Sequence, residues 1–178
     1  SDLTTNTNGN IVMILTAGDI ILNDGDAAVT QTGGDSRQSN GTAVSANGSG
    51  NILIDANTGN LDINSDILSG TGHITLKAAT DILVGDATAT GVDITTAGTI
   101  SLDAEAATGV VTMAADAKIT ATGSSLRLNA GADITVGQLI AQNVSLVADA
   151  GSVKNADDGN ITNVTAINLR INADDVIG

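Results

Sequence analysis

The stretch GHITLKAATDILV, residues 72–84, contains two short apolar runs separated by an Ala-rich corner. In the first run, Ile74 and Leu76 flank the polar residue Thr75. Such a period of two is typical of a β-strand that buries one of its faces. The stretch therefore predicts two short strands joined by a tight bend.

Stretches of this kind recur along most of the chain. The copies read GNIVMILTAGDIIL (9–22), GNILIDANTGNLDI (50–63), GVDITTAGTISL (91–102), GVVTMAADAKIT (109–120), SSLRLNAGADITV (124–136), NVSLVADAGSV (143–153) and INLRINADDVI (167–177). A period of about 18 residues aligns most of them, which is too short for a domain but suits one coil of a solenoid. This alignment makes two sets of residues equivalent, Ile52, Ile74, Val92, Val110, Leu126 and Val144 in the first strand and Ile82, Ile100, Ile119, Ile134 and Val153 in the second.

The composition favours coils of strands over helices. The 178 residues include no Phe, Tyr, Trp, Cys or Pro, so Ile, Leu, Val and Ala must form a thin core of similar layers. Each of the frequent glycines would cost a helix about 1 kcal/mol relative to Ala. Weaker third segments near 86–90, 138–141 and 161–164 add a third side to the coil. We therefore predict an all-β parallel β-helix with three-sided coils of about 18 residues, forming a single domain over residues 1–178.

Three segments depart from the repeat. Residues 23–49 break the period, which predicts an insertion loop between coils and a place for partner contacts. Residues 1–8 are polar and could fold over the first coil as an N-terminal cap. The last residues, 175–178, show no recognisable cap. We expect the chain to continue in a longer protein, and the fragment to associate end to end through its last coil.

The charge balance excludes some partners. Twenty acidic residues against six Lys and Arg give a net charge of −14. Nucleic acids and anionic lipids require a basic surface, so neither is an expected partner. No apolar run is long enough for membrane insertion, and the absence of Cys excludes disulfides and thiolate chemistry. All but one of the acidic residues are Asp, which favours turns.

Clustered carboxylates and amides suggest calcium as the most plausible bound ion. Ca²⁺ prefers six to eight oxygen ligands. None of the acidic loops fits an EF-hand or the glycine–aspartate nonapeptide repeat, and solvated turns are the alternative interpretation. The candidate ligands of weak calcium sites are Asp24, Asp26, Asp157, Asp158, Asp174 and Asp175.

Catalytic patterns are weak, and we expect no enzyme and no catalytic residue. A Ser-His-Asp arrangement would have to use His73, the only His, with Ser69 and Asp66 or Asp81, but no nucleophile-elbow motif surrounds any Ser. An enzyme that cleaves polysaccharides would be expected to have aromatic platforms and a cluster of basic residues, and the sequence shows neither. Ice binding would need continuous Thr rows, which the sequence does not show.

Two stretches, LNAGADITVGQLIAQNVSLVADAGSV (128–153) and GNILIDANTGNLDI (50–63), resemble the repeats of filamentous-haemagglutinin-type adhesins. The closing INLRINADDVIG (167–178) is similar to segments of giant repetitive bacterial surface proteins. The resemblance implies a right-handed coil in a long protein exported to the bacterial surface. It also implies a structural or adhesive spacer next to other domains of the same chain, in contact with host-cell, matrix or glycan surfaces. The alternatives are a carbohydrate-binding or carbohydrate-cleaving β-helix, and an ice-binding one.

Overall fold

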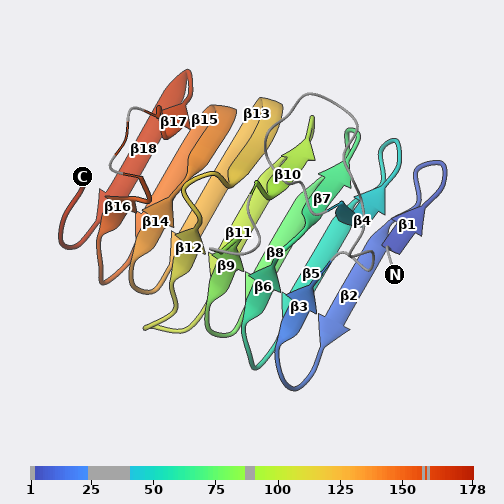
Figure 1. The fold of residues 1–178 in the computed structure, drawn as a ribbon, viewed down its shortest axis with the longest axis horizontal. Coiled ribbons are helices and arrows are strands. Elements are labelled where there is room, and N and C mark those ends of the chain that lie inside the picture. The colour runs from blue at the N-terminus through green and yellow to red at the C-terminus, as the bar shows by residue number, and fades with distance from the viewer. Residues whose placement is uncertain (1–2, 24–40, 87–90, 158, 160) are drawn as a thin grey trace.

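The computed structural model describes residues 3–23, 41–86, 91–157, 159 and 161–178. Every regular element in this part of the chain is a β-strand, and every strand pairing is parallel. The strands lie side by side along one axis, with the two termini at opposite ends (Figure 1). The predicted all-β parallel β-helix is confirmed.

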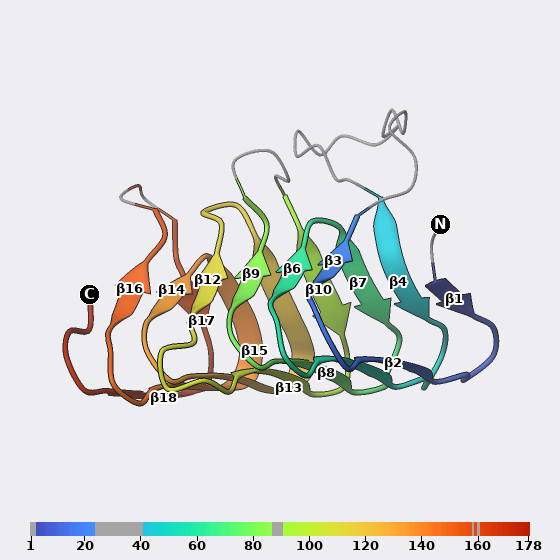
Figure 2. The same ribbon diagram turned by 90° about the horizontal axis from the view of Figure 1, so that it is seen from below.

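The strands form three faces, which the chain visits in turn (Figure 2). The third face is visited first within each coil, then the first face, then the second. β13 and β15 are long strands that run from the third face onto the first.

The first face contains β2 (Ile11–Leu15), β5 (Ile52–Ala56), β8 (Ile74–Ala78), β11 (Ile100–Ala104), β18 (Asn168–Ala173) and the ends of β13 (Lys118–Ala130) and β15 (Gln138–Ala148). The second contains β3 (Ile20–Leu22), β6 (Leu61–Ile63), β9 (Ile82–Val84), β12 (Val111–Met113), β14 (Ile134–Val136) and β16 (Val153–Asn155). The third contains β1 (Leu3–Thr5), β4 (Thr42–Ala46), β7 (Asp66–Ser69), β10 (Asp93–Thr96), β17 (Val164–Thr165) and the starts of β13 and β15.

The coil is longer than the sequence predicted. On the first face Ile52, Ile74, Ile100, Leu126, Val144 and Leu169 are in register. Successive coils therefore take 22, 26, 26, 18 and 25 residues, the separations that side-chain hydrogen bonds between neighbouring coils also span.

The predicted period was thus wrong for most coils, because it was too short. It placed Ile100 and Ile119 together on the second strand, whereas they lie on the first and third faces. All three faces share the same alternation, so the pattern alone does not distinguish one face from another.

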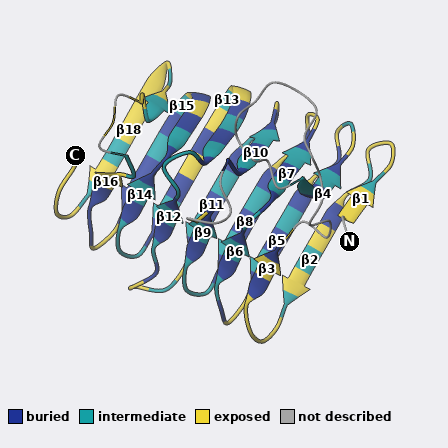
Figure 3. Cartoon of the chain, viewed as in Figure 1, coloured by how far each residue is buried: buried dark blue, intermediate teal, exposed yellow. Residues whose placement is uncertain are grey.

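The alternation itself predicted the core correctly. The apolar residues at alternate positions of these strands are fully buried, namely Ile74, Leu76, Ile82, Ile100, Leu102, Ile134 and Leu146. Of the residues that alternate with them, Thr75, Ser101 and Ser145 are partly exposed, and Arg127 is exposed. Figure 3 shows this as alternating bands along the central strands.

Close stacking explains the glycines at the corner before the first face. A Cβ atom on Gly72 would lie 1.9 Å from the carbonyl oxygen of Gly50, and one on Gly98 would lie 2.2 Å from that of Gly72. The buried hydroxyls of Ser69 and Thr96 donate to these two carbonyls over 2.7 and 2.6 Å. Only a residue without a side chain fits between successive coils here.

Two predicted boundaries need correction. β4 lies within the predicted insertion 23–49, pairs with β1 and β7, and buries Val44 completely. Residues 42–46 are thus part of a coil, which their small side chains concealed. β1 lies within the predicted cap 1–8, yet it pairs with β4 as an edge strand of the third face. Residues 24–40 of the predicted insertion lie outside the described residues.

The right-handed sense of the coil stays a prediction. In the part of the chain that is described, no helix has the length and apolar character needed to cross a membrane.

Candidate functional site

A row of polar side chains runs along the corner between the third and first faces. We call it the corner ladder, and its members are Asn10, Asn51, His73, Thr99, Ser125, Asn143 and Asn168. The side-chain oxygen of Asn10 accepts the backbone N–H of Asn51, and that of Asn51 accepts the N–H of His73, both over 2.8 Å. Near the other end, the Asn168 amide donates to Asn143 over 2.8 Å. Asn side chains therefore stack along the rod at these pairs, as in the amide ladders of cross-β structures.

His73 belongs to this ladder. It is exposed, as predicted, and its Nδ1 shares a hydrogen bond of 2.8 Å with the hydroxyl of Thr99. Ser69, the nearest candidate nucleophile, donates to the Gly50 carbonyl and accepts the N–H of Gly72. The residues of the hypothetical triad are therefore engaged in separate hydrogen bonds that tie coil to coil.

Aspartates occupy the corner before the second face. Asp19 accepts the backbone N–H of Asn60 over 2.8 Å, and Asp81 accepts that of Val110 over 3.0 Å. These carboxylates satisfy backbone donors that the bend removes from the sheet. The interpretation of the acidic residues as turn residues is confirmed at these positions.

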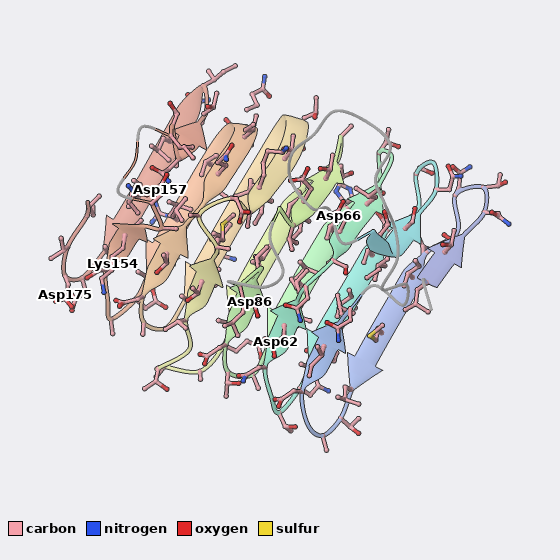
Figure 4. The ribbon with its side chains drawn as sticks, in the orientation of Figure 1. Asp62, Asp66, Asp86, Lys154, Asp157 and Asp175 are labelled. Atoms are coloured by element: carbon pink, nitrogen blue, oxygen red, sulfur yellow. The ribbon has the colours of Figure 1, made fainter. Side chains whose placement is uncertain are left out.

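Asp62 carries a carboxylate that its surroundings compensate poorly. It points outward from the second face, in register between Ile21 and Leu83, and its Oδ1 is buried without a hydrogen-bond partner. Burial raises the pKa of Asp62, and the nearby charges of Asp19, Asp81 and Asp86 raise it further. Asp62 and Asp86 lie close together in Figure 4. The position of Asp62 between two apolar neighbours becomes visible only once the register is known.

The predicted calcium ligands fall at separate places (Figure 4). The Asp157 carboxylate accepts the backbone N–H of Gly159 over 2.9 Å. The backbone N–H groups of Asp174 and Asp175 both donate to the Gly151 carbonyl over 3.1 Å. Within the described ranges, no three His, Asp or Glu side chains gather closely enough to hold a metal ion. Calcium binding stays a prediction, and three candidate ligands lie outside the described residues, Asp24, Asp26 and Asp158.

The threonines considered for ice binding form two short pairs. Thr95 lies beside Thr120 on the third face, and Thr112 lies beside Thr135 on the second. On the third face, Leu68 precedes the Thr95–Thr120 pair in the same row. The rows are therefore not continuous.

The lysines are held by carboxylates. Hydrogen bonding to Glu105 is the main reason that the pKa of Lys77 is raised. Hydrogen bonding to Lys154 is the main reason that the pKa of Asp133 is lowered. The shortest Nζ–carboxylate distances are 2.5 Å for Lys77–Glu105, 3.1 Å for Lys118–Asp93 and 2.5 Å for Lys154–Asp133.

Two arginines differ from the lysines. Arg127 and Arg170 form no ion pair with any described residue, and Arg127 instead donates to the Asn129 side chain over 3.1 Å. Both lie in one outward row of the first face, with Ser145 between them. Their backbones are two coils apart, about 9.6 Å by the spacing of paired strands.

The two arginines line a shallow groove of about 410 Å³. We call it the arginine groove. Its other lining residues are the polar Ser125, Asn143, Ser145 and Asn168 and the apolar Leu126, Val144 and Leu169. Guanidinium groups bind carboxylate and sulfate oxygens through paired hydrogen bonds. In the sequence the basic residues look scattered. Because the coils differ in length, the spacing along the chain does not show that Arg127 and Arg170 share a row.

Comparison of the chain with protein-family models, curated proteins and solved structures finds no match.

Proposed function

We propose that the chain is a structural and adhesive rod module of a long protein exported to the bacterial surface. The observation that carries this proposal is the continuous parallel register of the coils on all three faces. Each coil is tied to the next by sheet hydrogen bonds and by side-chain ladders at two corners. Such a stack keeps its two ends apart, as a spacer requires.

No catalytic role is assigned to any residue in this proposal. The expected partners are other domains of the same long chain and the surface that the protein contacts. The resemblance of residues 50–63 and 128–153 to adhesin repeats supports the extracellular location.

Single-molecule stretching of the chain between two inert handles tests the mechanical part of the proposal. We expect a resisting structure that opens in steps, since strands and core columns must separate coil by coil. Smooth extension at low force, like that of a disordered chain, would contradict a role as a stiff spacer.

A second candidate function is the binding of an acidic carbohydrate, and the arginine groove is the observation that favours it. Its two guanidinium groups, which form no ion pair with a described residue, suit carboxylate or sulfate groups, and its Ser and Asn side chains suit sugar hydroxyls. Binding would be local, because the net charge of −14 repels anions from the rest of the surface.

The test compares the parent chain with the double variant Arg127→Ser, Arg170→Ser on immobilised sulfated, carboxylated and neutral polysaccharides. We expect at least a tenfold loss of binding to one acidic polysaccharide. The control variant Lys154→Ser removes a positive charge from the second face, outside the groove, and should bind like the parent. Equal loss in the control, or parent binding to the neutral polymer alone, would reject the groove as the site.

A further inference from the structure

The two ends of the rod leave strands with one partner each. Among the described residues, β1, β2 and β3 pair only with β4, β5 and β6, while β17 and β18 pair only with β15. Their outer edges present backbone groups that can pair with another parallel strand. Figure 3 shows more exposed residues on β2 and β18 than on the central strands.

The last coil also exposes side chains that belong to the core. Leu169 stands in the inward column of Val144, yet it is 51% exposed whereas Val144 is 2% exposed. Ile177, which bridges to Val153 on the second face, is 58% exposed. Both side chains occupy inward columns, and no described strand lies on their outer side.

We propose that the last coil of one copy stacks on the first coil of a second copy, head to tail and in parallel register. This inference rests on the fold of the present chain by itself and not on the proposed function, in which neighbouring domains of a longer protein would occupy the same two ends. Continuing the columns places apolar side chains on apolar side chains at five inward positions. The pairs are Leu169 on Ile11, Ile171 on Met13, Ala173 on Leu15, Val164 on Leu3, and Ile177 on Ile20.

The corner ladder supports the same register. It ends in Asn168 at one end of the rod and begins with Asn10 at the other. In the stacked pair, the Asn10 amide of the second copy donates to the Asn168 side chain of the first copy. Asn168 donates to Asn143 in the same way within one copy. Matching of the amide row and the apolar columns in a single register favours a second copy as the occupant.

The outward row of the first face is compatible with this contact. Stacking brings Arg170 beside Val12, which is 64% exposed on the first coil. The aliphatic part of the arginine side chain can cover this valine, and no like charges meet in the row. Asn172 comes beside Ile14 in the next outward row in the same way.

Two properties follow from the geometry. The contact joins different surfaces of two copies, so it does not close and can continue into a filament. Each copy carries a net charge of −14, so long-range repulsion opposes stacking at low salt. Association should therefore strengthen as added salt screens the charges.

Sedimentation velocity over a range of concentrations tests the proposal, with folding of every variant checked by circular dichroism. The parent chain should sediment faster as its concentration rises. Leu169→Asp blocks the last coil and Leu3→Asp blocks the first, so each variant should stay monomeric because stacking would bury a charge. Ile140→Asp is the matched control: Ile140 is 39% exposed on an interior coil, and this variant should associate like the parent.

A mixture of the two end variants distinguishes head-to-tail stacking from other modes. Each retains one open end, so the mixture should form dimers and nothing longer. Ile177→Asp replaces Leu169→Asp if the latter does not fold. A monomeric parent at all concentrations would overturn the proposal. Unchanged association of Leu3→Asp would also overturn it, because two last coils would then join each other. Loss of association in Ile140→Asp would overturn it as well, because it indicates a lateral contact.

Discussion

The side-chain oxygen of Asn51 accepts a 2.8 Å hydrogen bond from the backbone N–H of His73, one coil further along the chain. The bond satisfies a donor at a corner, where regular sheet pairing is interrupted. It also fixes the register of two coils that are 22 residues apart in sequence.

Replacing Asn51 tests how much this bond stabilises the rod. Asn51→Ala should lower the free energy of unfolding by about 1 kcal/mol, the usual net contribution of one hydrogen bond. Asn51→Asp keeps an acceptor oxygen and should lose less. Urea unfolding measures both, and equal losses would show that the acceptor is unimportant.

Gly72 tests the close stacking of coils at the same corner. Gly72→Ala places a Cβ atom against the Gly50 carbonyl and should cost at least about 2 kcal/mol, as overpacked sites do. Thr71→Ala, at the exposed neighbouring position, is the control. If both variants melt at the temperature of the parent chain, the coils are further apart than described.

Ile100 tests the inward register of the first face. Ile100→Asp buries a charge without a partner and should abolish cooperative unfolding. Ser101→Asp puts the same charge on the outward side of the strand, where the fold should tolerate it. Thermal melting followed by circular dichroism distinguishes the two variants. If Ile100→Asp were the more stable of the two, Ile100 would face outward and the assigned register would be wrong.

Asp62 makes stability depend on pH. Its pKa is raised in the folded state, so the contribution of its protonated form is present below the unfolded pKa and is lost as pH rises through the folded pKa. Asp62→Asn should therefore be more stable than the parent at pH 7, because it removes a poorly solvated carboxylate that neighbouring aspartates repel.

The stability difference between Asp62→Asn and the parent should shrink as the pH falls toward about 3, where Asp62 itself is protonated. Denaturant unfolding at several pH values measures this difference. Asp175→Asn, an exposed control near the chain end, should show little change at pH 7. A difference for Asp62→Asn that does not vary with pH would remove the electrostatic explanation.

The orientation of the side chains could be predicted from the sequence, but the length of the coil could not. Alternation around Thr75 was enough to predict that Ile74 and Leu76 are buried, because a strand exposes every second residue. The same alternation occurs on all three faces, so Ile100 could be assigned to the wrong one. Val44 escaped notice because β4 is otherwise built of Thr, Ser and Ala.

The candidate surfaces depend on the register and so were harder to predict. Arg127 and Arg170 share a row only because the two coils that separate them take 18 and 25 residues. Nothing local to either arginine shows this. The apolar residues of the last coil were easier to anticipate, since residues 167–177 continue the apolar repeat.

Removal of one complete coil tests the central claim, that the chain is a stack of coils in register. Deleting residues 100–125 joins Thr99 to Leu126, which occupies the position of Ile100 one coil later, so every column stays continuous. Deleting 100–112 removes half as much chain but breaks the register on all faces. The decisive measurement is thermal melting followed by far-UV circular dichroism. The account predicts a cooperative β-sheet transition for the larger deletion and none for the smaller one. Loss of the transition in the larger deletion, or its retention only in the smaller, would contradict it.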